Sequence, residues 1–219
     1  MLNNMARMAQ HPLRSLLLLL LVAAFGLSAA LYIAQAPAAR PVWSLAALPP
    51  LAVGDWVFRL GTSAESQIIQ TLSKGEFSHI GMLVSLQPEP LIVHASTDDD
   101  PLRSNQVLSS TLREFLDPRL ARSFAIARPT FVTAKDNQQA AAWLLQQLQQ
   151  PFVLAERSSA HLYCTTLLAD ALQHSATPFQ PQWQQINAPL LRGEYLFPSA
   201  FANYPEVSWL YQSTDSQQP

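Results

Sequence analysis

Hydrophobic residues form one long run near the start of the sequence and short, patterned runs after it. Residues 15–36 carry no charge and are mostly Leu and Ala, and Arg7 and Arg14 precede them. A helix needs ~20 apolar residues to cross a bilayer, and basic residues before such a run favour a cytoplasmic N-terminus. The run predicts a transmembrane signal anchor over 1–36, with a cleaved signal peptide or a buried core helix as the alternatives.

The shorter apolar runs predict a mixture of strands and helices in the rest of the chain. Strands are expected at 56–59, 77–85, 91–96 and 123–128, and the Pro-rich segment 87–90 is expected to be a hairpin turn. Helices are expected at 63–74, 111–116, 134–149 and 160–174. Because successive strands are too close in sequence for parallel crossover connections, this order favours an α+β fold with an antiparallel sheet.

Composition divides the chain into four segments. After the anchor, residues 37–52 are rich in Pro and Ala and predict a stiff linker that lifts the following domain off the membrane. Residues 53–211 predict a single domain, which is large enough to bury a core without disulfide bonds. The Gln-rich residues 212–219 predict a flexible tail.

Charge and cysteine content exclude some classes of function. The net charge is −2, and no basic patch with interleaved aromatic residues is present, so nucleic-acid binding is not expected. The single cysteine, Cys164, cannot form an intramolecular disulfide. In an oxidising compartment a lone thiol has to be buried, lipidated or functional. The sequence does not specify an oligomeric state.

Cys164 is the first candidate for chemistry, because it lies near the start of the helix predicted at 160–174. Unpaired backbone N–H groups and the helix dipole at such a position favour a thiolate and can hold an oxyanion. The sequence therefore predicts a nucleophile with a lowered pKa. The alternative reading is a buried structural cysteine.

Two histidines on neighbouring predicted strands are candidates for its partners. His79 begins an otherwise apolar strand, and Gly81 on the same face leaves room for another backbone to approach. A histidine that faces the start of a thiol-bearing helix is what a Cys–His pair requires. Hairpin pairing would place His94 beside His79, where it could orient the ring. The alternatives are a core histidine for His79 and strand-end polarity for His94.

A zinc site made of the two histidines and the cysteine is the competing chemistry. It is disfavoured because no carboxylate or second thiol lies at ligand spacing beside these residues. We therefore expect no metal and no organic cofactor.

A set of short motifs, in a fixed order, resembles a known family. The motifs are Gly-Asp at 54–55, Phe-Ser-His-Ile-Gly-Met at 77–82, Val-His-Ala at 93–95, Tyr-Cys-Thr at 163–165 and Phe-Pro-Ser at 197–199. Together they resemble the YiiX/YebB-like branch of the NlpC-type, papain-like cysteine hydrolases over about Val53 to Phe201. In this circularly permuted branch the histidine strand precedes the cysteine helix.

The resemblance implies a permuted papain-like fold, with an antiparallel sheet packed against the cysteine helix, and amidase or peptidase chemistry. It implies that Cys164 is the nucleophile, His79 the base and His94 the third polar group. Two departures bear on substrate preference and on the contact that orients the base. Close relatives often have Glu at the third position, and many have Ser-Glu where this chain has Thr165-Thr166.

Several further residues are candidates for the substrate pocket. They are Tyr163, Ser78, Asp55 and Thr165, of which Asp55 is also typical of a turn and Tyr163 of simple packing. The acidic run 98–100 could border the cleft and attract an amine-bearing substrate, and a solvated loop is the alternative.

These observations predict a membrane-anchored, extracytoplasmic cysteine hydrolase that cleaves an amide bond through an acyl-enzyme. The domain would face the periplasm from the bacterial inner membrane, or be soluble there after cleavage of the anchor. Two substrate classes stay open, namely the peptide stem of peptidoglycan and a lipid or N-acyl amide. The non-enzyme alternatives are a binding module of the same fold with an inert Cys164, and a structural partner in an envelope complex.

Overall fold

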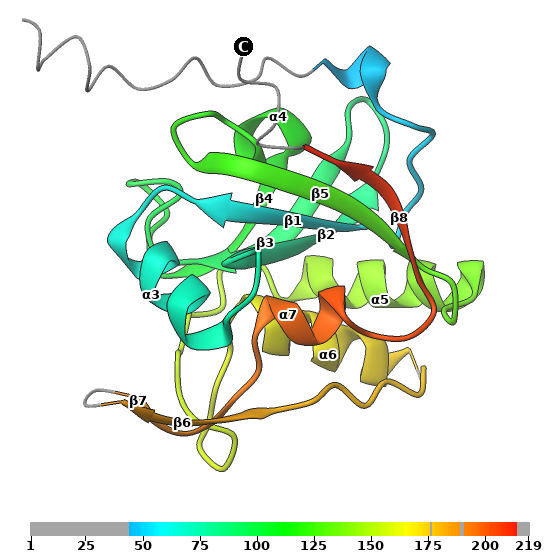
Figure 1. Cartoon of the computed structure of the whole chain (residues 1–219). Helices are drawn as coiled ribbons and strands as arrows, with labels where there is room; N and C mark the ends of the chain where they lie inside the picture. Colours follow the sequence, from blue (N-terminus) through cyan, green and yellow to red (C-terminus); the bar gives the residue numbers. More distant parts are fainter. Residues whose placement is uncertain (1–43, 176, 189–190, 214–219) are drawn as a thin grey trace, which may run out of the picture. The chain divides into compact units, whose positions relative to one another are not determined.

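A six-stranded antiparallel sheet is the centre of the computed structural model, which describes residues 44–175, 177–188 and 191–213. The strand order is β4-β3-β2-β1-β5-β8, and every neighbouring pair is antiparallel (Figure 1). The strands are β1 (Trp56–Gly61), β2 (His79–Ser85), β3 (Leu91–Ser96), β4 (Gln106–Thr111), β5 (Ala121–Pro129) and β8 (Val207–Gln212). The predicted α+β fold with an antiparallel sheet is confirmed.

Helices and one small hairpin surround this sheet. The helices are α3 (Ala64–Ser73), α4 (Leu112–Phe115), α5 (Ala134–Gln146), α6 (Cys164–His174) and α7 (Pro198–Ala202), with a 3₁₀ turn, η1, at Leu45–Ala47. The hairpin consists of β6 (Gln184–Ala188) and β7 (Leu191–Tyr195). Figure 1 shows α5 and α6 side by side against one face of the sheet. Ser63 caps α3, its hydroxyl accepting a hydrogen bond from the Ser66 N–H at 3.2 Å.

Apolar side chains cover both faces of the sheet, because successive residues of a strand point to opposite sides. In β1, Trp56 and Phe58 belong to the core shared with α5 and α6, whereas Val57 belongs to a second core on the other face. Leu45, Leu48 and Leu51 pack against this second core. Part of the segment 37–52, which was predicted to be a linker, therefore lies against the domain.

The structure corrects several element boundaries. The cysteine helix begins at Cys164, not near residue 160, because residues 153 and 162 pair in an isolated antiparallel bridge. The sequence did not predict β4, the hairpin β6–β7 or β8, and β8 continues through Gln212, the first residue of the predicted tail. The predicted anchor over 1–36 lies outside the described residues. Among the helices of the described residues, none has the length and apolar character needed to span a membrane.

Candidate active site

Cys164 occupies the first position of α6. Its predecessor Tyr163 is extended, with φ −138° and ψ 176°, and the Tyr163 N–H donates to the Thr166 hydroxyl at 2.9 Å. The thiol is almost buried, at 7% exposure of the residue. Backbone hydrogen bonds from Ile80 and Thr165 reach it, so the thiol lies beside β2, one residue along from His79.

Cys164 and His79 line the same cavity, which has a volume of about 340 Å³. His79, at the start of β2, is partly exposed in its wall. Ser78 and Tyr163 line this cavity too, as predicted for the pocket, whereas Thr165 and Asp55 do not. A larger hollow of about 700 Å³ contains none of the candidate residues, so the smaller cavity is the candidate site.

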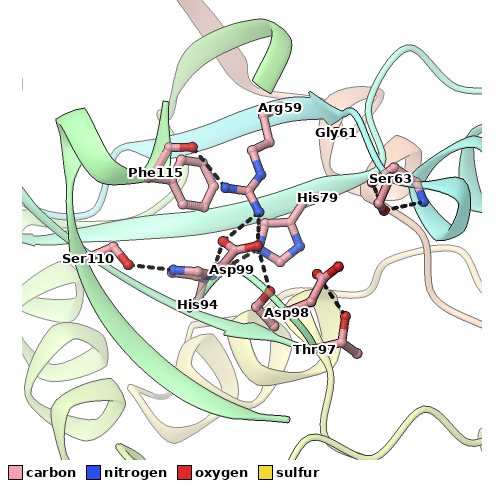
Figure 2. A network of polar contacts seen from close by, with 12 residues as sticks. Arg59, Gly61, Ser63, His79, His94, Thr97, Asp98, Asp99, Ser110 and Phe115 are labelled. Carbon is pink, nitrogen blue, oxygen red and sulfur yellow. Dashed lines mark hydrogen bonds and ion pairs between the residues drawn. The ribbon is translucent and has the colours of Figure 1, made fainter. Parts of the chain in front are cut away.

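The two histidines contact each other through their rings. His79 Nε2 lies 3.0 Å from His94 Nδ1, and His94 Nε2 lies 3.0 Å from the Ser110 hydroxyl of β4 (Figure 2). His94 is completely buried. Since His79 Nε2 is engaged, Nδ1 is the nitrogen left to interact with a thiol. The structure therefore brings all three predicted catalytic residues to one place, and their catalytic roles stay a prediction.

Gly81 allows the His94 ring to lie beside His79. It precedes Met82, which pairs with Val93 in the register of β2 and β3, and a Cβ at Gly81 would be 2.5 Å from Ile92 Cγ2 and 3.2 Å from His94 Cβ. The close approach that the sequence predicted at this glycine is therefore that of the neighbouring strand β3, not of the cysteine helix.

The sequence analysis missed Arg59 and Ser110, whereas Asp99 belongs to the acidic run 98–100, of which Asp98 and Asp99 line the cavity. The Arg59 Nη2 atom lies 2.5 and 2.6 Å from the two carboxylate oxygens of Asp99, and Asp99 Oδ2 lies 3.7 Å from His94 Nδ1 (Figure 2). Asp99 is not part of a solvated loop, since its side chain is only 8% exposed. The available signal was Arg59 itself, a charge within an otherwise apolar strand.

Burial gives the site an unexpected protonation state. It raises the pKa of the Cys164 thiol to about 11, although backbone hydrogen bonds from Ile80 and Thr165 oppose this. Burial and then the nearby Arg59 charge lower the pKa of His79 well below its ordinary value of 6.5. The prediction of a lowered thiol pKa is wrong for the resting protein, because desolvation outweighs the helix start. At neutral pH the Cys164 thiol and the His79 imidazole are therefore both uncharged.

The remaining candidate pocket residues have structural partners. Thr165 is fully buried and donates to the Leu196 carbonyl at 2.8 Å, and the Tyr163 hydroxyl accepts from the Leu196 N–H at 2.9 Å. Asp55, which is 1% exposed, binds the Arg128 guanidinium at 2.7 and 2.8 Å and caps the turn at Ala52. Asp55 is therefore the turn residue of the alternative reading.

A small apolar pocket adjoins the thiol. Its volume is about 30 Å³, and it is lined, besides Cys164, by Ile69, Leu72, Ser78, Leu154, Tyr163, Leu191, Tyr195, Leu196, Phe197 and Pro198. A group that binds here has to be small and apolar, because the lining offers almost no polar partner.

Comparison with known proteins identifies the family. Residues 50–208 match the family described as permuted papain-like amidase enzyme, YaeF/YiiX, C92 family. The chain belongs to this family. Among solved structures, the metalloprotein YiiX from Escherichia coli O157:H7 is similar, with a TM-score of 0.61 and 18% identity over 74% of this chain and 97% of that one. No curated protein matches the chain.

That YiiX structure is described as a metalloprotein, and three residues with possible metal-binding atoms also meet in the candidate site of this chain. Ligand atoms of His79, His94 and Asp99 all lie within 4.8 Å of one another, so the sequence argument that no carboxylate lies beside the histidines is wrong. However, Arg59 binds both oxygens of Asp99 and places a positive charge where a cation would bind. In this arrangement the three residues do not fit a metal site.

Proposed function

We propose that this chain is a cysteine amidase in which Cys164 attacks an amide carbonyl and His79 is the general base. The observation that carries the proposal is the shared cavity, in which a thiol at a helix start and an imidazole held by a second imidazole lie together. Membership of the permuted papain-like amidases supports the same chemistry.

The protonation state determines how the reaction would begin. Since thiol and imidazole are both neutral, His79 Nδ1 takes the Cys164 proton as sulfur attacks, and no preformed ion pair is required. His79 Nε2–H donates to His94 Nδ1 throughout, which keeps the ring in the orientation that a base needs.

The remaining steps follow from the same groups. The Cys164 N–H lies in the first turn of α6, where N–H groups have no intrahelical partner, and would hold the oxyanion together with a neighbouring donor. The imidazolium then protonates the leaving amine, and the acyl group stays on sulfur. Water attacks this thioester with His79 again as base, which releases the acid and regenerates the thiol.

For the substrate, the apolar pocket beside Cys164 supports an amide with a small apolar group next to the scissile bond. An alanine methyl group of a wall stem peptide and the first carbons of an acyl chain both meet this requirement. Both predicted classes, the stem peptide and the lipid or N-acyl amide, remain within the proposal. We also propose that the anchor holds the domain at the periplasmic face of the inner membrane, which protease accessibility in spheroplasts would test.

One observation favours a second candidate function. A thiol with a pKa near 11 is a poor nucleophile unless a base assists it, as expected if the cavity only binds its ligand and Cys164 is inert. The two functions differ in whether Cys164 ever becomes acylated.

The test is to trap the acyl-enzyme. Purified full-length protein is mixed with a stem tetrapeptide or an N-acyl amino acid amide, and intact mass and product release are followed. We expect an acyl adduct on Cys164 and turnover that falls roughly 10³-fold or more in Cys164→Ser and His79→Ala. His174→Ala, at an exposed position outside the cavity, is the control and should leave turnover unchanged. Full activity of Cys164→Ser would exclude the amidase mechanism.

A further inference from the structure

Arg59 and Asp99 form a buried ion pair beside the two histidines. Their side chains are 5% and 8% exposed, and among the guanidinium–carboxylate pairs of the described residues this is the only one with both partners buried. Removing two charges from water costs free energy that their attraction often does not recover, so such a pair is weak support for stability. Its position beside His94 calls for another explanation.

The surroundings hold both members of the pair in place. Arg59 Nη1 donates to the Phe115 carbonyl at 2.8 Å, and the guanidinium lies over the Phe115 ring at 4.5 Å. The Ser96 hydroxyl donates to Asp99 Oδ1 at 2.7 Å. The same Phe115 ring packs against His79 and His94, with centroid distances of 5.5 and 4.9 Å. The ion pair and the histidines therefore form one packed unit (Figure 2).

The chemistry of His79 depends on one proton in this unit. Only one hydrogen lies between His79 Nε2 and His94 Nδ1 while both rings are neutral. If it belongs to His79, then His79 Nδ1 has a free lone pair and can take the thiol proton. If it belongs to His94, His79 Nδ1 carries a hydrogen and cannot act as a base.

A carboxylate near His94 Nδ1 would favour the inactive arrangement. Asp99 Oδ2 is 3.7 Å from this nitrogen, and an unpaired negative charge there would attract the hydrogen to His94. Arg59 engages both oxygens of the carboxylate and so largely cancels this attraction.

We propose that Arg59 and Asp99 are positioning residues for the catalytic histidines: Arg59 neutralises Asp99 so that the shared hydrogen stays on His79, and Asp99 offsets the Arg59 charge when His79 becomes an imidazolium. The inference rests on the proposed function of Cys164 and His79. Both side chains also line the cavity, and in this role they act through the histidines. Removing either charge alone impairs the base, and removing both together restores it.

The direction of each electrostatic effect agrees with this role. Burial chiefly lowers the pKa values of both histidines, with Arg59 lowering them further and Asp99 raising them. For the Cys164 thiol, whose pKa burial chiefly raises, Arg59 again lowers and Asp99 raises the pKa. The other charged groups near the histidines are Arg103, which acts on His94, and Glu65, Asp98 and Arg119, which line the cavity.

The test uses full-length protein labelled with ¹⁵N-histidine, whose ring shifts report both tautomer and titration. We expect wild-type His79 to carry its hydrogen on Nε2. Arg59→Gln should move the hydrogen to Nδ1 and raise the His79 midpoint by about one pH unit or more, whereas Asp99→Asn should lower it by a similar amount. The double variant should return tautomer and midpoint to the wild-type values.

A matched control and a second readout separate this role from a structural one. Arg157→Gln removes a charge from an exposed ion pair with Glu194 and should shift nothing. At pH 9, the rate of iodoacetamide labelling reports how much of Cys164, the only thiol, is thiolate. Labelling should be slower in Arg59→Gln, because Arg59 lowers the thiol pKa, and faster in Asp99→Asn, because Asp99 raises it. If a single variant does not fold, the test uses the neutral double variant and Arg59→Lys. Both are expected to have the wild-type tautomer and titration midpoint of His79.

Shifts of the same sign in both single variants, or an unrestored double variant, would overturn the proposal. Repeating the titration in Cys164→Ala makes the result independent of turnover. Suppose that the two charge variants show opposite shifts in the Cys164→Ala background and that the wild-type protein never becomes acylated. This result would refute the amidase mechanism and leave the electrostatic coupling standing. A wild-type His79 with its hydrogen on Nδ1 would refute the tautomer assignment itself.

Discussion

At the scale of single residues, the site combines a protonated thiol with a neutral imidazole. Burial raises the pKa of Cys164 to about 11 and lowers that of His79 well below 6.5. The two shifts move the pKa values apart, so no pH exists at which thiolate and imidazolium are both the dominant resting forms. In the mechanism that we propose, proton transfer therefore has to accompany attack on the substrate.

This arrangement predicts a broad pH profile. His79 acts as a base only when it is unprotonated, so activity should rise with pH through a midpoint below 6.5 and stay level until the thiol titrates near 11. The measurement is kcat/KM for an amide substrate between pH 4 and pH 10. A midpoint above 7 on the acid side would contradict the depressed pKa of His79.

Gly81 predicts a second effect at this scale. In Gly81→Ala the new methyl group would meet Ile92 Cγ2 at 2.5 Å and press against His94. Because a packed strand cannot move freely, we expect a loss of about 1–3 kcal/mol in the free energy of unfolding and a longer His79–His94 contact. Urea unfolding and ¹⁵N-histidine spectra check both. Wild-type stability together with unchanged ring shifts would show that the strands separate without disturbing the histidines.

Metal removal gives a third residue-scale prediction. Because Arg59 binds both Asp99 oxygens, dialysis against a chelator should leave the activity and the histidine ring shifts unchanged. Elemental analysis before and after dialysis is the measurement. Bound metal that disappears together with activity would show that Asp99 exchanges Arg59 for a cation.

At the scale of elements, the start of α6 is joined to the segment between β7 and α7. Tyr163 and Thr165, on either side of the cysteine, bind the N–H and the carbonyl of the same residue, Leu196. The position of the thiol therefore depends on a segment more than thirty residues later. Thr165 stands where Ser is common, and it keeps the hydroxyl that this contact needs.

Loss of this contact should affect stability more than chemistry. Tyr163→Phe leaves the Leu196 N–H buried without its acceptor, which should cost about 1–3 kcal/mol. Thr165→Val should have a similar cost for the carbonyl, whereas Thr165→Ser keeps the donor and serves as the control. Thermal and urea unfolding measure the difference. If Thr165→Val and Thr165→Ser were equally stable, the prediction would be contradicted.

The sequence predicted those parts of the fold and site that depend on local patterns. The strands around His79 and His94 were predicted because their residues are nearly all apolar, and the hairpin between them because of its prolines. Strand β4 was missed because Ser109, Ser110 and Thr111 give it a polar sequence. The Arg59–Asp99 pair was missed because its members are 40 residues apart and meet only when the sheet forms. The helix start suggested a thiolate because sequence does not reveal how deeply a residue is buried.

At the scale of the whole molecule, the buried histidines make the stability of the folded protein depend on pH in the acid range. The pKa of His94 falls, chiefly through burial, from 6.5 to about 4. Between these values the unfolded chain binds a proton that the folded protein does not, so stability is lost as the pH falls through this window. The expected loss from His94 is about 3 kcal/mol at pH 4.

Urea unfolding at pH 7 and at pH 4.5 measures this dependence. His79, whose pKa is lowered too, should add to it, and His94→Asn should reduce it. His174→Ala, at an exposed position, is the control and should leave it unchanged. Equal stability at the two pH values would show that the folded protein takes up these protons without penalty.

The burial of Cys164 also bears on its lifetime under oxidising conditions. With a pKa near 11, roughly one molecule in 10⁴ carries a thiolate at pH 7. Peroxides and disulfide exchange consume thiolates and leave thiols largely untouched. In the mechanism that we propose, Cys164 loses its proton only in the presence of substrate, so it is protected from sulfenic acid formation between turnovers and needs no second cysteine to rescue it.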